Sequence, residues 1–273
     1  MVWSSDAWVV VSAPPLGNHH ADVKRVRALL RDRGARDEHG LFVCEGPRVI
    51  TAALEQQAPI HEVLVGVDAT PAAKAVADRA VECFIPVRQL AEGVGARVSA
   101  TTTAQGVFAL VPFRRARLDA LAGATLVVVA PLLADPGNAG TLIRSAAAAG
   151  AEIIVLGPGS VDAYNPKTVR ASAGACFAVR IVEGVPAVTA LEALGRSGVQ
   201  RVGALVSGGS PPESVDLTVP VAIVLGHEVH GLAGDLPLDA GITVPMQGTE
   251  SLNVAMAGTL LLFEAARQRR AGA

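Results

Sequence analysis

Apolar positions follow a helical spacing and a strand spacing in turn along the first part of the chain. Residues 21–33 place their valines and leucines on one side of a predicted helix. Gly46-Pro47 predicts the start of a second helix, because a first-turn proline lacks only an N–H that has no partner there. Further strands are expected at residues 41–44, 62–67, 83–87 and 107–111, and a further helix at residues 72–80. The pattern predicts a small α/β domain over residues 18–115, preceded by an extension of residues 1–17.

From residue 116 onward, strands and helices alternate more regularly. Residues 125–130 form a continuous run rich in β-branched residues, which is typical of a strand buried on both faces. A helix is expected at residues 138–149, with Asn138 as its N-cap, and a last helix at residues 251–270, with Ser251 as its cap. Other strands are expected at residues 153–156, 177–182, 202–206, 221–225 and 242–244. The alternation predicts an α/β domain with a mostly parallel sheet over residues 116–273.

Composition narrows the class of protein. Hydrophobic residues make up 51% of the chain and charged residues 18%, which excludes a disordered chain. The longest apolar runs are about half of the roughly 20 residues that a membrane-spanning helix needs, so no membrane partner is expected. The three cysteines are far apart and favour a reduced, cytoplasmic location over a disulfide framework. The net charge of −2 gives no general signal for nucleic acid, although cations gather at residues 24–36 and 114–117.

Three segments carry candidate chemistry, and the first follows the predicted buried strand. Residues 135–144 begin a helix at the point where ligand sites of parallel sheets gather, and they include Arg144. The second segment, residues 165–174, carries Lys167 and Arg170 on one short helix. Taken alone, Arg144 is equally compatible with a solvent-facing helix surface, whereas the positions of Lys167 and Arg170 favour a solvated helix face over a site.

The third segment lies near the end of the chain. Leu225-Gly226-His227-Glu228 ends a predicted strand, and Val244-Pro245-Met246 and Ser251-Leu252-Asn253 follow. Its histidines do not have the H-E-x-x-H spacing, so we expect no metal. The turn at residues 157–159 lacks the G-x-G-x-x-G pattern, and Pro131-Leu132-Leu133 follows the first buried strand; both argue against a nicotinamide-dependent oxidoreductase.

Together these segments resemble the SpoU/TrmH group of the SPOUT superfamily, which are S-adenosylmethionine-dependent RNA ribose 2′-O-methyltransferases. Motif one matches at Asn138, Gly140 and Arg144, motif two at residues 165–174, and motif three at residues 225–228, 244–246 and 251–254. Residues 42–48 and 103–107 also resemble the family's ribosomal-protein-like substrate-binding domain. The family often has Asn where His227 stands.

The resemblance implies a trefoil knot in the C-terminal domain, a homodimer, and S-adenosylmethionine bound by the loops of motif three. The implied cofactor-binding residues are Leu225, Gly226, Val244, Met246, Ser251 and Leu252. The implied catalytic residues are Arg144, Asn138, Arg170, Glu228, Ser251 and Asn253. Candidate RNA contacts, chosen from charge, are Lys24, Arg25, Arg27, Arg48 and Lys167.

Two questions stay open at this stage. Arg144 would act either as the base or as a charged stabiliser, and removing a proton from an arginine at neutral pH costs roughly 7 kcal/mol. Because the family's ribosomal RNA enzymes usually carry a separate N-terminal domain, 23S ribosomal RNA is the favoured substrate. The alternatives are a tRNA ribose 2′-O-methyltransferase and an RNA-binding protein without catalysis.

Overall fold

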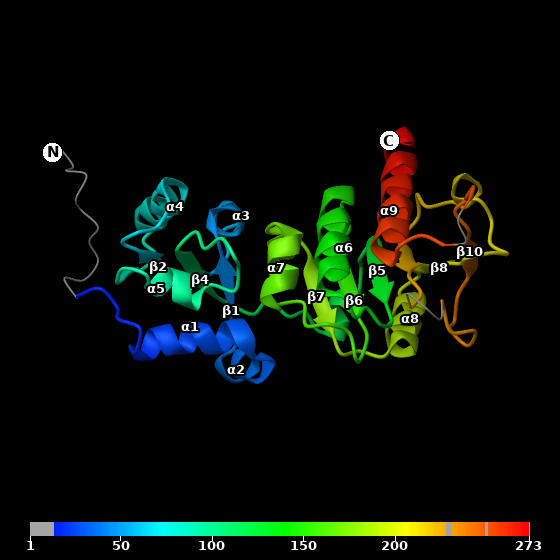
Figure 1. Ribbon diagram of the computed structural model, residues 1–273. Helices are drawn as coiled ribbons and strands as arrows, with labels where there is room; N and C mark the ends of the chain where they lie inside the picture. Colours follow the sequence, from blue (N-terminus) through cyan, green and yellow to red (C-terminus); the bar gives the residue numbers. More distant parts are fainter. Residues whose placement is uncertain (1–13, 228–230, 249–250, 273) are drawn as a thin grey trace. The chain divides into compact units, whose positions relative to one another are not determined.

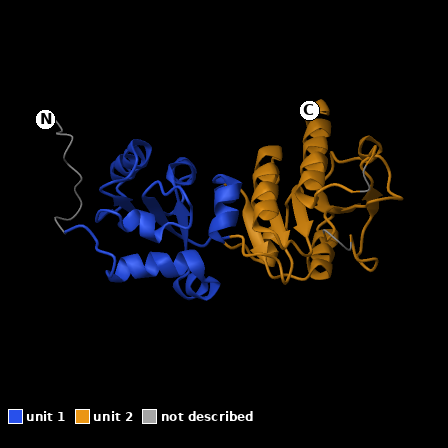
Figure 2. Cartoon of the chain, in the orientation of Figure 1, with its two compact units in different colours: residues 1–113, 164–177 blue, residues 114–163, 178–273 orange. Residues whose placement is uncertain are grey.

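The computed structural model describes residues 14–227, 231–248 and 251–272 (Figure 1). The chain forms two compact units (Figure 2). The first contains residues up to Phe113 together with Tyr164–Phe177, and the second contains Arg114–Ala163 and the chain from Ala178 onward. The segment of motif two thus groups with the first unit. The domain boundary predicted between residues 115 and 116 stays a prediction.

The first unit is a four-stranded mixed sheet between two layers of helices (Figure 1). Helix α1 (Ala21–Arg31) and helix α5 (Val94–Val98) share an apolar core with one face of the sheet. The strands, in sheet order, are β1 (Leu41–Glu45), β4 (Val107–Pro112), β2 (Glu62–Gly66) and β3 (Val87–Leu90), and only β2 and β3 are parallel. The remaining helices of this unit are α2 (Arg33–His39), α3 (Pro47–Glu55), α4 (Pro71–Glu82) and α7 (Pro166–Ser172).

Two local details in the first unit differ from the sequence prediction. The first helix ends at Arg31, because the Asp32 side chain accepts hydrogen bonds from the N–H groups of Gly34 and Ala35 and thereby caps α2. The strand expected from residue 83 begins only at Val87. Phe84 has a φ of 60°, in the left-handed region, which forms a turn that no strand can include.

The second unit is built on a six-stranded sheet in which every pair of neighbouring strands is parallel. Helices α6 (Pro136–Ala149) and α9 (Val254–Ala271) cover one face, and α8 (Ala187–Arg196) covers the other (Figure 1). The strands, in sheet order, are β10 (Ala240–Ile242), β8 (Gln200–Ala204), β9 (Val221–Val224), β5 (Leu126–Ala130), β6 (Ile153–Leu156) and β7 (Arg180–Glu183). The predicted parallel α/β fold is confirmed, and no helix of the described ranges has the length and apolar character needed to cross a membrane.

Both predicted helix caps in the second unit are wrong. Asp135 caps α6 by accepting from the N–H of Asn138, because Pro136 occupies the first helical position. Asn253 caps α9 by accepting from the N–H groups of Ala255 and Met256, so that helix begins after Ser251. The motif residues Asn138 and Ser251 therefore lie close to a helix start without capping it.

Strand β10 has neighbours on both of its edges. On one edge it pairs with β8, and the N–H of Leu205 donates to the carbonyl of Ile242 at 2.7 Å. On the other edge the backbone N–H of Ser210 donates to the carbonyl of Gly241 at 2.9 Å. The carbonyl of Ser210 accepts from the N–H of Thr243 at 3.0 Å. The connection from β8 to β9 therefore runs along the outer edge of β10.

Candidate functional site

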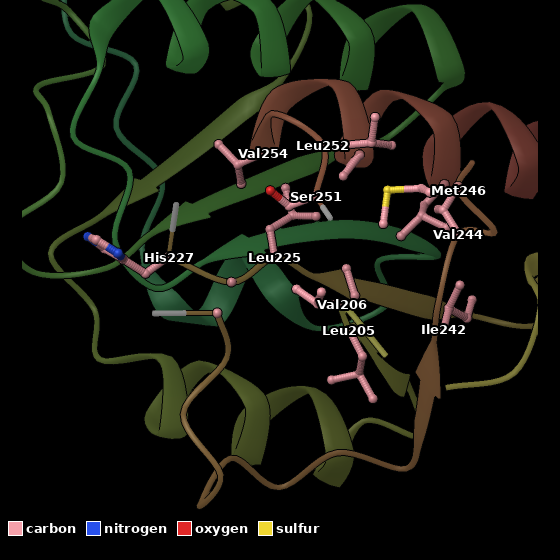
Figure 3. Close-up of a pocket in the computed structure, with 15 residues that line it drawn as sticks. Leu205, Val206, Leu225, His227, Ile242, Val244, Met246, Ser251, Leu252 and Val254 are labelled. Atoms are coloured by element: carbon pink, nitrogen blue, oxygen red, sulfur yellow. The ribbon is translucent and has the colours of Figure 1, made fainter. Parts of the chain in front are cut away.

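A pocket lies in the second unit at the carboxyl ends of three neighbouring strands. It is bounded by the residues that follow β8, β9 and β10 and by the start of α9 (Figure 3). Its volume of about 180 Å³ greatly exceeds the roughly 10–15 Å³ that one buried water requires, so it has room for a small molecule. The lining residues are Ala204, Leu205, Val206, Leu225, Gly226, His227, Gly231, Ile242, Val244, Met246, Ser251, Leu252, Val254, Ala257 and Leu261.

All six predicted cofactor-binding residues line this pocket, although they come from three separate stretches of the chain. Leu225 and Gly226 follow β9, Val244 and Met246 follow β10, and Ser251 and Leu252 precede α9. Ligands of parallel sheets bind at this edge. The structure brings these residues together; their role in binding a cofactor stays a prediction.

Close backbone approach shapes one side of the pocket. A Cβ on Gly226 would lie 2.6 Å from the carbonyl carbon of Gly231, so no other residue fits without moving the backbone. The backbone groups of His227 and Gly231 exchange two hydrogen bonds, of 2.8 and 3.0 Å, which fixes this approach. The described walls are mainly aliphatic and include the Ser251 hydroxyl, whereas the His227 ring points away from the other lining side chains (Figure 3). Such a slot suits a flat ring with polar edges.

A polar joint connects the helix of motif one to the helix that follows the pocket. The Asn253 side chain, besides capping α9, donates from Nδ2 to Oδ1 of Asn138 at 3.0 Å. Two turns further along, the hydroxyls of Thr259 and Ser145 lie 2.7 Å apart. Gly258 permits close packing between these pairs, because a Cβ there would lie 2.7 Å from Leu142 Cδ1. The joint fixes motif one relative to the end of motif three.

Arg144 extends from α6 into solvent. Its side chain is exposed, and no described residue forms an ion pair or a hydrogen bond with its guanidinium. An exposed arginine keeps its charge and all its N–H donors. Arg144 is therefore available to an anionic ligand.

Arg170 has a different environment, in the first unit. Its Nη1 lies 3.4 Å from Oε2 of Glu45, a carboxylate that is almost fully buried. Lys167, also on α7, has an exposed side chain. Glu228, the remaining predicted catalytic residue, lies outside the described residues.

The predicted RNA contacts on the first helix and on α3 divide into two groups. Lys24 and Arg48 are exposed. Arg25 forms ion pairs with Glu62 and Asp22, and Arg27 donates to the Asn18 side chain at 2.8 Å, so these two cations already have partners within the unit. The exposed pair has the greater freedom to contact a phosphate.

Neither a cluster of metal ligands nor a reactive Cys44 thiol is seen in the part of the chain that the structure describes. Within the described ranges no group of three His, Cys, Asp or Glu side chains is placed to hold a metal ion. Burial raises the pKa of the Cys44 thiol well above its ordinary value, which makes Cys44 a poor nucleophile. Of the predicted catalytic side chains, Asn138 and Asn253 contact each other, and Ser251 lines the pocket.

One wall of the pocket consists of residues that were not predicted from the sequence. Ala204 ends β8, Leu205 and Val206 follow it, and Val254 and Leu261 come from α9. The first three line the pocket because β8 lies beside β9 in the sheet. The order of parallel strands is a long-range property, so no local pattern at residues 204–206 indicates it.

Comparison with known families assigns both parts of the chain. Residues 125–263 match the SpoU rRNA Methylase family, and residues 20–109 match the MRM3-like substrate binding domain. The first match contains all three motifs. The second covers the greater part of the first unit.

Individual relatives are similar over nearly the whole chain. The 23S rRNA (guanosine(2553)-2'-O)-methyltransferase RlmP of Bacillus subtilis is 31% identical, over 86% of this chain and 92% of its own length. An rRNA methyltransferase structure from Sinorhizobium meliloti superposes with a TM-score of 0.80 at 30% identity, covering 93% of this chain and 97% of the other. The SpoU methyltransferase AviRb from Streptomyces viridochromogenes, in complex with AdoMet, gives a TM-score of 0.78 at 29% identity, covering 93% and 100%. This chain belongs to the SpoU rRNA methylase family.

Proposed function

We propose that this protein transfers a methyl group from S-adenosylmethionine to the 2′-oxygen of a ribose in RNA, with 23S ribosomal RNA as the substrate. The observation that carries the proposal is the pocket of the second unit, where separate parts of motif three line one ligand-sized cavity. Two related structures with bound AdoMet, from Sinorhizobium meliloti and Streptomyces viridochromogenes, support the choice of methyl donor.

The lining residues fit that donor. The aliphatic side chains of Leu205, Leu225 and Leu252 would enclose the flat adenine ring, and backbone groups near Gly226 and Met246 would contact its polar edge. Gly226 permits the backbone approach that forms this slot. S-adenosylmethionine supplies a methyl group on a positively charged sulfur, which is already an activated leaving group.

The residues of the chain then have to orient the ribose and stabilise charge on its oxygen. Arg144 is exposed and keeps its positive charge, which favours the role of charged stabiliser over that of base. It would donate hydrogen bonds to the 2′-oxygen as negative charge develops there. Asn138, Ser251 and Asn253 would orient Arg144 and the loop of motif three, and Arg170 would hold an RNA phosphate. Glu228 keeps its place as a predicted catalytic residue.

The separate first unit favours ribosomal RNA over tRNA. It matches a substrate-binding domain, and RlmP, which resembles this chain along most of both lengths, is named for 23S rRNA. We propose that the exposed cations Lys24, Arg48 and Lys167 contact the RNA backbone. The three cysteines are far apart in the sequence and predict no disulfide framework, so the cytoplasm is the proposed location.

We also propose a homodimer with a trefoil-knotted second unit. Met256, Leu260 and Phe263 are between 44% and 53% exposed on α9, at a spacing that places them on one side of the helix. Such a stripe is what a second copy would cover. The connection outside β10 supports the knot, because a later strand there lies inside an earlier loop.

Methyl transfer to an unmodified 23S ribosomal RNA transcript tests the function directly. We expect radioactive methyl from S-adenosylmethionine to enter the RNA, and ribose-methylation mapping to locate it on one 2′-oxygen. Transfer to tRNA but not to 23S ribosomal RNA would overturn the substrate. Donor binding without transfer to either RNA would leave an RNA-binding protein without catalysis.

Light scattering tests the dimer. We expect a mass of twice 27.8 kDa for the protein and 27.8 kDa for the double variant Leu260→Glu with Phe263→Glu. An unaltered protein with the monomer mass at micromolar concentration would contradict the proposed interface.

A further inference from the structure

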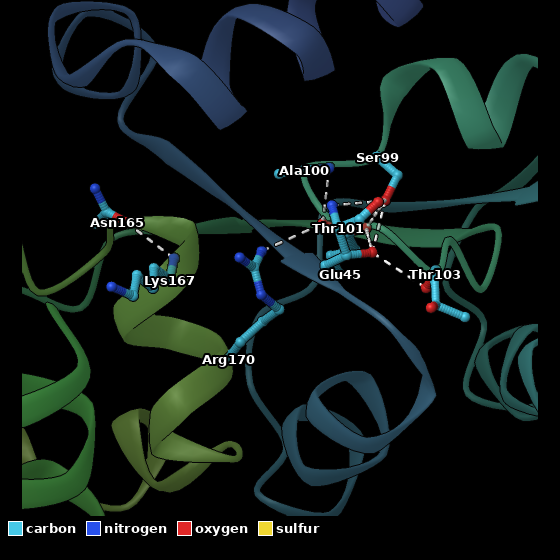
Figure 4. Close-up of polar contacts among 8 residues, drawn as sticks. All are labelled: Glu45, Ser99, Ala100, Thr101, Thr103, Asn165, Lys167 and Arg170. Atoms are coloured by element: carbon cyan, nitrogen blue, oxygen red, sulfur yellow. Dashed lines mark hydrogen bonds and ion pairs between the residues drawn. The ribbon is translucent and has the colours of Figure 1, made fainter.

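We propose that Glu45 is a positioning residue that holds Arg170 for contact with the RNA backbone, so that the first unit supplies an aligned cation as well as an RNA-binding surface. The inference rests on the proposed function, and it names a residue outside the three motifs. It is carried by the polar cluster of Glu45, Ser99, Thr101 and Arg170 (Figure 4).

Glu45 is the last residue of β1, and its carboxylate is held from two sides. The segment after α5 supplies donors: Oε1 accepts from the hydroxyls of Ser99 and Thr101, the latter at 3.2 Å, and Oε2 accepts from the N–H of Ala100 at 3.3 Å. Arg170 Nη1 approaches Oε2 from α7 at 3.4 Å. With its side chain only 4% exposed, the carboxylate has one fixed orientation.

The geometry leaves most of the Arg170 guanidinium for a ligand. Glu45 is its one hydrogen-bonding partner among the residues that the structure describes, and the contact uses a single nitrogen. The Arg170 side chain is 30% exposed. A guanidinium has five N–H donors, so one anchored edge leaves a second edge free for a phosphate.

The segment that carries Arg170 is itself fastened to the first unit. The Tyr164 ring packs against Phe42 and Phe113, with centroids 4.7 and 4.8 Å apart. Beyond α7, Gly174 lies so close to Ala52 that a Cβ would approach the Ala52 Cβ to 2.2 Å. Contacts before, within and after α7 thus anchor motif two, and Glu45 supplies the contact that involves the cation.

Charge burial explains why the two residues should act together. A buried carboxylate is stable only when it is paired and hydrogen-bonded, so removing Arg170 alone leaves a buried charge without its counter-ion. Removing the charge of Glu45 alone leaves Arg170 exposed to solvent but no longer oriented. The two single substitutions should therefore harm different properties, and the double substitution should harm less than their product.

The test is a double-mutant cycle with Glu45→Gln and Arg170→Gln on the full-length protein. The measured quantities are kcat and KM for an unmodified 23S ribosomal RNA transcript, RNA affinity without the methyl donor, donor affinity and melting temperature. We expect Glu45→Gln to reduce kcat/KM for RNA about tenfold at unchanged donor affinity. In the Arg170→Gln background the same change should have no further effect on kcat/KM and should raise the melting temperature.

A matched control separates positioning from stability. Val43→Ala removes packing from the same strand without touching the cluster, and it should lower the melting temperature while leaving kcat/KM unchanged below the transition. If Glu45→Gln fails to fold, the paired changes Ser99→Ala and Thr101→Val keep both charges and should reduce kcat/KM in the same direction by a smaller factor. Multiplicative effects of Glu45→Gln and Arg170→Gln on kcat/KM would overturn the inference. An unaltered protein that transfers no methyl group would instead overturn the proposed function.

Discussion

Arg144 and Arg170 lie on helices of two different units, and their surroundings are opposite in kind. On α6, hydrogen bonds join the helix to α9 through Asn138 and Asn253 and leave the Arg144 guanidinium in solvent. On α7, the arginine itself is the bonded group, held by buried Glu45. The second unit holds α6 in place and leaves the Arg144 guanidinium in solvent, whereas the first unit holds the Arg170 guanidinium itself. An exposed cation contributes little to stability but is available for chemistry, and a paired one contributes to both.

Arg144→Ala tests whether the exposed arginine acts in methyl transfer without contributing to stability. We expect methyl transfer to fall by about 10²–10³-fold, the typical loss when one donor to a developing oxyanion is removed. Melting temperature and donor affinity should not change, because the side chain has no partner among the described residues. Arg196→Ala, an exposed arginine on α8, is the control and should leave the rate unaltered. A rate within threefold of the unaltered protein would remove Arg144 from the proposed mechanism.

The close backbone approach at Gly226 allows a test of whether the pocket binds the methyl donor. Gly226→Ala places a methyl group against Gly231, and we expect S-adenosylmethionine affinity, measured by calorimetry, to drop at least about tenfold. Gly234→Ala is the matched control, because nothing lies within 4 Å of the added Cβ. Equal affinities of the two variants would mean that the donor binds elsewhere.

Asn253 allows the cap and the inter-helix bond to be separated. Asn253→Ala removes both and should lower the free energy of unfolding by about 1 kcal/mol, the usual value of an N-cap. Asn253→Asp keeps an acceptor for the cap but loses the donor to Asn138. Urea denaturation should therefore show near-normal stability for the aspartate variant, while its methyl-transfer rate falls. If Asn253→Asp lowers the free energy of unfolding as much as Asn253→Ala does, the hydrogen bond to Asn138, and not the cap, accounts for the lost stability.

Most helices and strands are predictable from the sequence because they depend on local patterns, whereas the strand order of each sheet is not. The apolar run of β5 and the Pro47 start of α3 specify their elements through short-range burial and dihedral preferences. The grouping of motif three around one pocket required the family resemblance. The pairing of Glu45 with Arg170 had no local signal, because the residues are 125 positions apart and meet only through tertiary packing. The two N-cap predictions were wrong because each helix start has two polar residues, two or three positions apart, that could cap it, and the backbone conformation decides between them.

The smallest expected effect concerns an exposed ion pair on α9. Hydrogen bonding from Arg267, assisted by Gln268, lowers the pKa of Glu264 from 4.5 to about 2. A lowered pKa in the folded state means that the carboxylate adds stability above pH 4.5, and that this contribution is lost as the pH falls toward 2. Glu264→Gln should cost at most about 1 kcal/mol at pH 7, because solvent screens such pairs.

Urea denaturation across this acid range measures that pH dependence. The difference between Glu264→Gln and the unaltered protein should shrink as the pH falls. Glu192→Gln, which loses a looser pair with Arg196 at 4.0 Å, should show no measurable difference at any pH. A cost at pH 7 that persists at pH 2 would trace the effect to packing instead of charge.

The placement of residues 164–177 limits how evolution can recombine this protein. These residues lie between β6 and β7 along the chain, yet their aromatic and glycine contacts are with Phe42 and Ala52. A gene fusion that replaced the N-terminal module alone would leave Tyr164 and Gly174 without their contacts to Phe42 and Ala52. Grafting a new RNA specificity onto this methylase therefore requires transplanting two stretches of sequence at once, and lineages that exchanged modules should show both stretches changing in step.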